Sequence, residues 1–191
     1  MIELIKQMMQ PKTNSSALFQ LSIPVAIYLG SSYAWQYWLF TVLFSLSFYV
    51  LIGNNIGLHR YFTHRHFSVT KPVEWLFLWS GSMIMLGSPL SYAMTHMVHH
   101  KHPDTNLDPH GPVHGIKSWF IYFQKTVDPA ETPMFSRRLI ELKTKYEWAH
   151  RYYIPLVMLN AGLLYLIGWE VFLFGWWIPA GIASWIVTWS V

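Results

Sequence analysis

Ten histidines stand out in this chain of 191 residues because most of them lie in short clusters. They are His59, His64 and His66, then His96, His99, His100 and His102, then His110 and His114, and finally His150. The chain contains no cysteine, so a bound metal ion must be held by nitrogen or oxygen. Neutral imidazole suits iron, copper, zinc and nickel, and a histidine-rich set without cysteine argues against structural zinc. The pattern therefore predicts a metal centre and favours iron or copper redox chemistry.

The spacing within two of the clusters separates candidate ligands from other histidines. His96, His99 and His100 follow an i, i+3, i+4 pattern, which on a helix places all three on one face. His59 and His64 are five residues apart, so on an α-helix they point about 140° apart, and we expect them to serve two adjacent ions. Because metal–nitrogen bonds are only about 2 Å long, the two clusters must meet. A lone histidine is more often solvated or structural than a ligand, and we expect this of His66, His102, His114 and His150.

The composition indicates the environment in which these histidines act. Apolar residues make up 53% of the chain and charged residues only 12%, whereas soluble domains carry about 25% charge. A membrane protein is therefore expected. The net charge of +4 does not indicate a nucleic-acid partner, because the basic residues are interleaved with apolar segments and match no DNA- or RNA-binding motif.

Two long stretches without charge are candidates for membrane hairpins. No acidic or basic side chain occurs from Thr13 to Leu58, and from Tyr152 to Val191 the only one is Glu170. At 1.5 Å per helical residue, each stretch is long enough for about two bilayer crossings. We expect spans at about 15–30, 37–57, 152–168 and 171–191, with Glu170 in the turn of the second hairpin.

The distribution of basic residues predicts the orientation of these hairpins. All 13 Lys and Arg lie outside them, which places the N-terminus and the histidine segment in the cytoplasm. The uncharged segment Trp75–Met97 would be a fifth span, but it would move the following basic residues to the far side, and Gly81, Gly87 and Ser88-Pro89 interrupt it. We expect there an interfacial or protein-covered helix, a break, and a helix carrying the second histidine cluster. The predicted fold is a single all-α membrane domain over 1–191, with about four transmembrane helices in two hairpins and a cytoplasmic helical cap that carries the histidines.

Two sequence runs resemble a known family. The runs GLHRYFTHRHF (57–67) and HMVHHKHPDTNLDPH (96–110) closely resemble the first two histidine boxes of the membrane fatty acyl desaturases of the stearoyl-CoA, delta-9 type. The resemblance implies four membrane helices under a cytoplasmic cap and a non-haem di-iron centre. It also implies O₂-dependent removal of two hydrogens from a fatty acyl chain, carried as acyl-CoA or acyl-lipid, with electrons from ferredoxin or cytochrome b5.

The resemblance also assigns roles to individual residues. The positions that match iron ligands are His59, His64, His96, His99 and His100. The positions that match groups orienting those ligands are Asp104, Asp108 and His110. Iron and dioxygen would perform the C–H cleavage, and the protein would position a flexible chain in an apolar slot.

The sequence departs from the family pattern at two places. Met97 stands where the second box normally has Arg, and the family's Asn-x-x-x-His element and third histidine box, which follow the fourth span, have no counterpart before Val191. We therefore expect a truncated or split desaturase that does not assemble a complete di-iron centre unless another polypeptide, or His102, His114 and His150, supplies the missing ligands. The spacing of those three histidines does not recreate the missing box. The alternatives are a related di-iron membrane hydroxylase or ketolase, and a non-catalytic membrane remnant.

Overall fold

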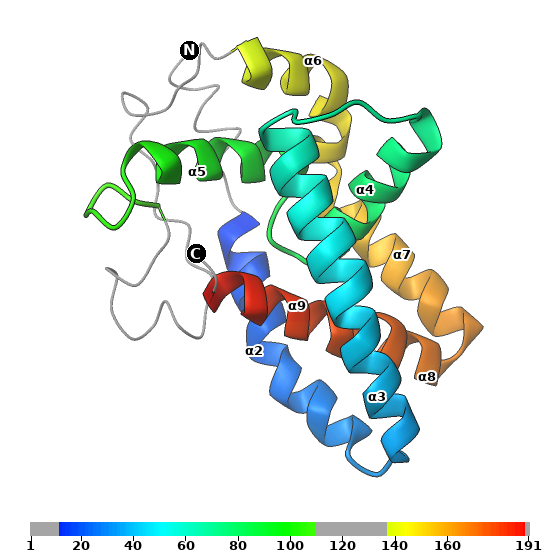
Figure 1. Ribbon diagram of the computed structural model, residues 1–191. Coiled ribbons are helices and arrows are strands. Elements are labelled where there is room, and N and C mark those ends of the chain that lie inside the picture. The colour runs from blue at the N-terminus through cyan, green and yellow to red at the C-terminus, as the bar shows by residue number, and fades with distance from the viewer. Residues whose placement is uncertain (1–11, 110–136, 190–191) are drawn as a thin grey trace.

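The computed structural model describes residues 12–109 and 137–189, and its regular secondary structure there is entirely helical, as predicted (Figure 1). Two of the helical segments, η1 and η4, are π-helices, in which hydrogen bonds join residues five apart. The helices are α2 (Lys12–Gly30), α3 (Trp35–Phe44), η1 (Ser45–Thr63), α4 (Lys71–Met83), α5 (Pro89–Lys101), α6 (Arg137–Arg151), α7 (Tyr153–Ile167), α8 (Trp169–Phe172), η4 (Leu173–Trp177) and α9 (Ile178–Trp189).

The first predicted hairpin is present, but its second helix is longer than expected. α2 ends at Gly30, and a short turn leads into α3 and η1, which together form one apolar helix of 29 residues, Trp35–Thr63. The sequence predicted an end near Gly57, yet the helix continues through it. Gly57 is a packing position, because a Cβ there would lie 3.1 Å from Cβ of Phe77 in α4.

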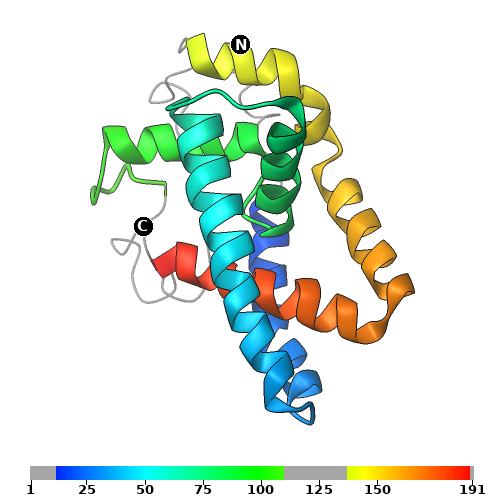
Figure 2. The same ribbon diagram turned by 45° about the vertical axis from the view of Figure 1, so that its right-hand side comes forward.

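The second predicted hairpin is formed by α7 and the continuous helix α8–η4–α9, Trp169–Trp189. Glu170, expected in the connecting turn, lies in the first turn of α8. The α8–η4–α9 rod runs across α2 and the α3–η1 helix rather than alongside them (Figures 1 and 2).

Two helices of the described residues are long and apolar enough to cross a membrane, Trp35–Thr63 and Trp169–Trp189. The apolar segments Ser15–Gly30 and Tyr153–Ile167 are shorter than the roughly 20 residues that a perpendicular crossing needs. The four-span arrangement therefore stays a prediction.

The uncharged segment Trp75–Met97 is divided into two helices, as the sequence predicted. α4 ends at Met83, and after a break α5 begins at Pro89. Gly87 has a φ of 113°, which favours glycine, and Ser88 caps α5 by accepting a hydrogen bond from the Ser91 N–H.

Gly81 does not interrupt the helix, contrary to the prediction. It lies inside α4 and faces Gly53 of η1: a Cβ on Gly81 would come within 2.8 Å of Cγ of Leu58 and 3.0 Å of the Gly53 carbonyl oxygen. The glycine therefore lets two helix backbones approach closely.

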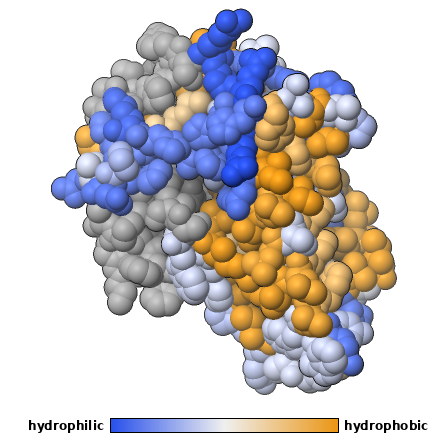
Figure 3. Space-filling model, viewed as in Figure 1, coloured by the Kyte–Doolittle hydropathy of each residue, from blue (hydrophilic) through white to orange (hydrophobic). Residues whose placement is uncertain are grey.

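The arrangement separates a polar end from an apolar body. Hydrophilic residues gather over α5, α6 and the adjoining end of η1, whereas hydrophobic residues cover the middle of the face over α3–η1 and α7 (Figure 3). The buried core runs between these elements and includes Leu58 and Phe62 of η1, Leu142 of α6 and Val187 of α9. The histidine clusters lie at the polar end, where η1 ends beside α5.

Candidate metal centre

Four of the five predicted ligands converge between η1 and α5. His59, His64, His96 and His100 each offer one ring nitrogen, and these four atoms lie within 4.8 Å of one another. The Nε2 atoms of His64 and His100 are 3.2 Å apart. Two nitrogens bound to one ion at about 2.1 Å are at most about 4.2 Å apart. With small side-chain movements the four imidazoles fit around one ion.

The π-helical winding of η1 explains how His59 and His64 come together. The sequence interpretation assumed an α-helix, in which the pair diverges; in a π-helix residues five apart lie on one face. The His64 N–H accordingly donates to the His59 carbonyl at 3.1 Å, and the two ring centroids are 4.7 Å apart. The pair can therefore serve one ion, contrary to the expectation of two.

The second cluster approaches from α5. His96 and His100 are one helical turn apart with ring centroids at 4.4 Å, and His96 lies 4.6 Å from the His59 ring. The helix capped at Ser88 thus presents both rings to the end of η1.

His99, the fifth predicted ligand, lies outside the group of four. Its Nδ1 donates to Oδ2 of Asp108 at 2.8 Å. Asp108 is fully buried and also accepts a hydrogen bond from the Asp104 N–H at 3.0 Å. A carboxylate that holds Nδ1–H of a histidine fixes the ring and leaves Nε2 with its lone pair for a ligand.

The remaining predicted positions differ in their surroundings. Asp104 has an exposed side chain and a φ of 57°, and it contacts Asp108 through its backbone. His110 and His114 lie outside the described residues. His150 is buried with Nδ1 2.7 Å from Oγ of Ser88, which is the environment of a structural histidine.

Two imidazoles of the group have lowered pKa values. Desolvation lowers the pKa of His64, and the neighbouring His100 and His66 lower it further. Desolvation likewise lowers the pKa of His100, with a contribution from His99. A lowered pKa favours the neutral ring at pH 7, which is the form that binds a metal ion.

Two groups near the centre were not identified from the sequence. Asn54 lies five residues before His59 on the same π-helical face; it is buried, and its Oδ1 has no hydrogen-bond partner among the described residues. A polar pair, Asn54-Asn55, in an otherwise apolar span is a recognisable sign of function.

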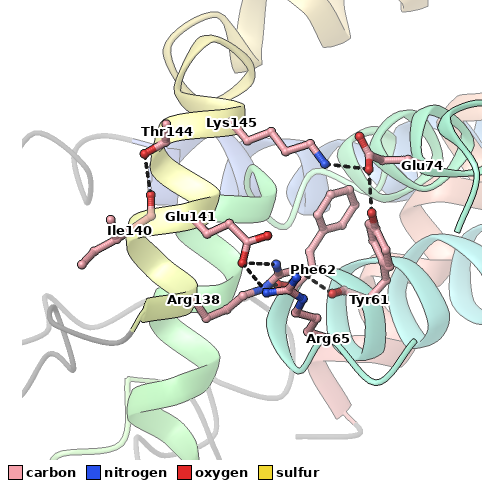
Figure 4. A network of polar contacts seen from close by, with 9 residues as sticks. All are labelled: Tyr61, Phe62, Arg65, Glu74, Arg138, Ile140, Glu141, Thr144 and Lys145. Carbon is pink, nitrogen blue, oxygen red and sulfur yellow. Dashed lines mark hydrogen bonds and ion pairs between the residues drawn. The ribbon is translucent and has the colours of Figure 1, made fainter. Parts of the chain in front are cut away.

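The other group is an ionic network that joins η1, α4 and α6 (Figure 4). Glu74 accepts hydrogen bonds from the Tyr61 hydroxyl at 2.6 Å, from Lys145 at 2.8 Å and from Lys71 at 3.1 Å. Burial alone would raise the pKa of Glu74, but these hydrogen bonds outweigh it and lower the pKa to about 2. The network is assembled from distant segments, so no local pattern reveals it.

Residues 12–109 and 137–189 form helices with an apolar body and a group of imidazoles at the polar end. This arrangement fits the class of membrane proteins with a histidine metal site. No protein-family model matches it. The chain is 30% identical over 175 residues to an acyl-CoA C20 Delta5-desaturase of Anemone leveillei, which covers 82% of this chain and 53% of the relative. It is 33% identical over 129 residues to an sn-1 stearoyl-lipid 9-desaturase of Anabaena variabilis, covering 65% of this chain and 46% of the relative.

A third relative is the delta-9 acyl-lipid desaturase 2 of Arabidopsis thaliana, 28% identical over 161 residues, with 84% of this chain and 48% of the relative covered. The chain belongs to the membrane fatty acyl desaturase family. It spans about half the length of the curated relatives that it matches.

Proposed function

We propose that this chain forms the imidazole-bearing part of an O₂-dependent fatty acyl desaturase. The observation that carries the proposal is the convergence of four ring nitrogens, from two segments more than 30 residues apart, within 4.8 Å. Bound iron would supply the oxidising chemistry that cleavage of an unactivated methylene C–H bond requires, which side-chain acids and bases cannot provide. The names of the relatives favour desaturation over hydroxylation or ketone formation.

The chain's own residues hold and orient the centre. His59, His64, His96 and His100 would bind one ion, and Asp108 orients His99 so that Nε2 is available to a second. A second ion needs more donors than His99 alone, and we propose that further imidazoles, such as those of a third histidine box, complete it. That box can come from another polypeptide.

We propose an integral, multi-pass location with the imidazoles on the cytoplasmic side. The polar end of the molecule carries the histidines, and the Lys and Arg residues lie outside the uncharged stretches, which supports this orientation. A cytoplasmic centre is accessible to a soluble electron donor such as ferredoxin or to cytochrome b5. The substrate would be a fatty acyl group, since the relatives are named for acyl-CoA or acyl-lipid substrates.

A chimera tests the activity. The segment of the Anabaena variabilis relative that matches this chain would be replaced by the corresponding residues of this chain, and lipids of the expressing cells would be analysed by gas chromatography of their fatty acid methyl esters. We expect a new double bond in lipid-bound stearoyl chains, and its loss in the His100→Ala chimera.

Two outcomes would contradict the proposal. A hydroxylated product in place of the olefin would favour the related di-iron hydroxylases. A folded, iron-loaded chimera without any oxidised product would favour the non-catalytic alternative. The His66→Ala chimera is the matched control, because His66 is exposed and lies outside the group of four.

A further inference from the structure

The end of η1, which carries the His59–His64 pair, is held by a side chain from α6. The last carbonyl groups of a helix have no partner within the helix. Here Arg138 donates from Nε to the Phe62 carbonyl and from Nη2 to the Tyr61 carbonyl, both at 2.7 Å (Figure 4). The two carbonyls lie between the candidate ligands in sequence, and Arg138 is more than 70 residues away.

The charge and burial of Arg138 make this contact strong. The side chain is only 16% exposed. A cation at a helix C-terminus interacts favourably with the helix dipole, and charge-assisted hydrogen bonds are about twice as strong as neutral ones. A guanidinium presents its donors in a rigid fork, which suits two successive carbonyl groups.

Glu141 extends the contact to the other side of His64. Its Oε2 lies 3.2 Å from Nη1 of Arg138 and 2.8 Å from Nη1 of Arg65, the residue that follows His64. Arg65 has a φ of 53°, which is uncommon for a residue with a side chain. α6 therefore contacts the chain two residues before His64, at Phe62, and one residue after it, at Arg65.

We propose that Arg138 is a positioning residue for the metal centre, and this inference rests on the centre proposed above. The His59 and His64 rings meet only because the last turn of η1 is π-helical. π-helical turns are rare, and an α-helical rearrangement would turn the two rings about 140° apart. By binding the Tyr61 and Phe62 carbonyls, Arg138 stabilises the π-helical turn that brings His59 and His64 together as ligands.

Titration with Co²⁺ alone, followed by its visible absorption, tests the inference in the purified chain. We expect Arg138→Gln to weaken Co²⁺ binding about 10- to 100-fold, as loss of a group that orients ligands typically does. In the metal-free chain, hydrogen exchange should accelerate at the His64 and His66 amides, which donate to the His59 and Arg60 carbonyls. Arg151→Gln is the matched control, because Arg151 is on the same helix but is 67% exposed in its ion pair with Glu147.

Arg138→Lys is the second variant. If Arg138→Gln does not fold, Co²⁺ affinity and hydrogen exchange are compared between the wild type and Arg138→Lys. Lysine keeps the charge but lacks the guanidinium fork, so we expect Co²⁺ affinity between those of wild type and Arg138→Gln. Wild-type affinity and wild-type exchange at His64 and His66 in the folded variants would overturn the inference. Absence of Co²⁺ binding by the wild type would instead overturn the metal centre, and the exchange rates would still decide whether Arg138 holds this turn.

Discussion

At the scale of single residues, the structure distinguishes two aspartates that the sequence treated alike. Asp108 is buried against His99, whereas the side chain of Asp104 is exposed. In the chimera with the Anabaena variabilis relative, we expect Asp108→Asn to lower the affinity for the second ion about 10- to 100-fold, because His99 loses the carboxylate that orients it. Asp104→Asn should leave the affinity unchanged. Isothermal titration with Co²⁺ compares them, and equal affinities for both variants would contradict the role of Asp108.

The lowered pKa of Glu74 predicts that the protein becomes less stable at acid pH. Its pKa is about 2 in the folded chain against an ordinary value of 4.5, so the ionised group stabilises the fold above about pH 4.5. That contribution should decrease as the pH falls from 4.5 towards 2. Thermal unfolding in detergent should show this loss in the wild type and not in Glu74→Gln. Glu147→Gln is the control, since its pair with Arg151 is exposed and worth about 0.3–0.5 kcal/mol. If the melting temperatures of the wild type and Glu74→Gln fall equally between pH 6 and 2, the stabilising role of the ionised Glu74 is contradicted.

The histidine spacing predicted five ligands, and four of them converge in the structure, whereas His99 pairs with Asp108. Local periodicity identified the His96–His100 turn on α5 correctly, because one helix face is set by the sequence alone. The His59–His64 pair was assigned the wrong angle because a π-helix has no local sequence signature. The role of Arg138 cannot be predicted from local sequence patterns, because its contact with Phe62 depends on the packing of α6 against η1.

At the scale of elements, the contact between η1 and α4 depends on two facing glycines. A Cβ on Gly81 would overlap Leu58 and crowd the Gly53 carbonyl. We expect Gly81→Ala to destabilise the protein by about 1–3 kcal/mol, the usual cost of overpacking. Gly162→Ala on α7 is the control: it meets no atom within 4 Å and should be neutral or slightly stabilising. Thermal unfolding of both variants in the same detergent measures the difference, and equal melting temperatures would contradict the close approach.

Element boundaries followed from charge and glycine patterns only in part. The uncharged stretches and Ser88-Pro89 located the hairpins and the start of α5. The sequence predicts that a span ends at Gly57 and that Gly81 interrupts an apolar segment, whereas both glycines are inside helices. A glycine in a helix either ends it or lets another backbone approach, and the sequence does not distinguish these uses.

At the scale of the whole molecule, the orientation in the membrane can be tested because the chain has no native cysteine. Single cysteines at Arg65 and Lys101 should react with an impermeant thiol reagent from the cytoplasmic side. A cysteine at Ser32, in the turn after α2, should react from the opposite side. Labelling of Arg65→Cys and Lys101→Cys from different sides would contradict the convergence of the two histidine clusters.

The central claim is that imidazoles from η1 and α5 bind a common metal ion. X-ray absorption spectroscopy of the Fe²⁺-loaded chain, combined with metal analysis, tests this most directly. We predict scattering from several imidazole nitrogens, lost together with the bound iron in His96→Ala and His100→Ala and retained in His66→Ala. Iron bound equally well by the His96→Ala and His100→Ala chains, or an iron site coordinated by oxygen alone, would contradict the account.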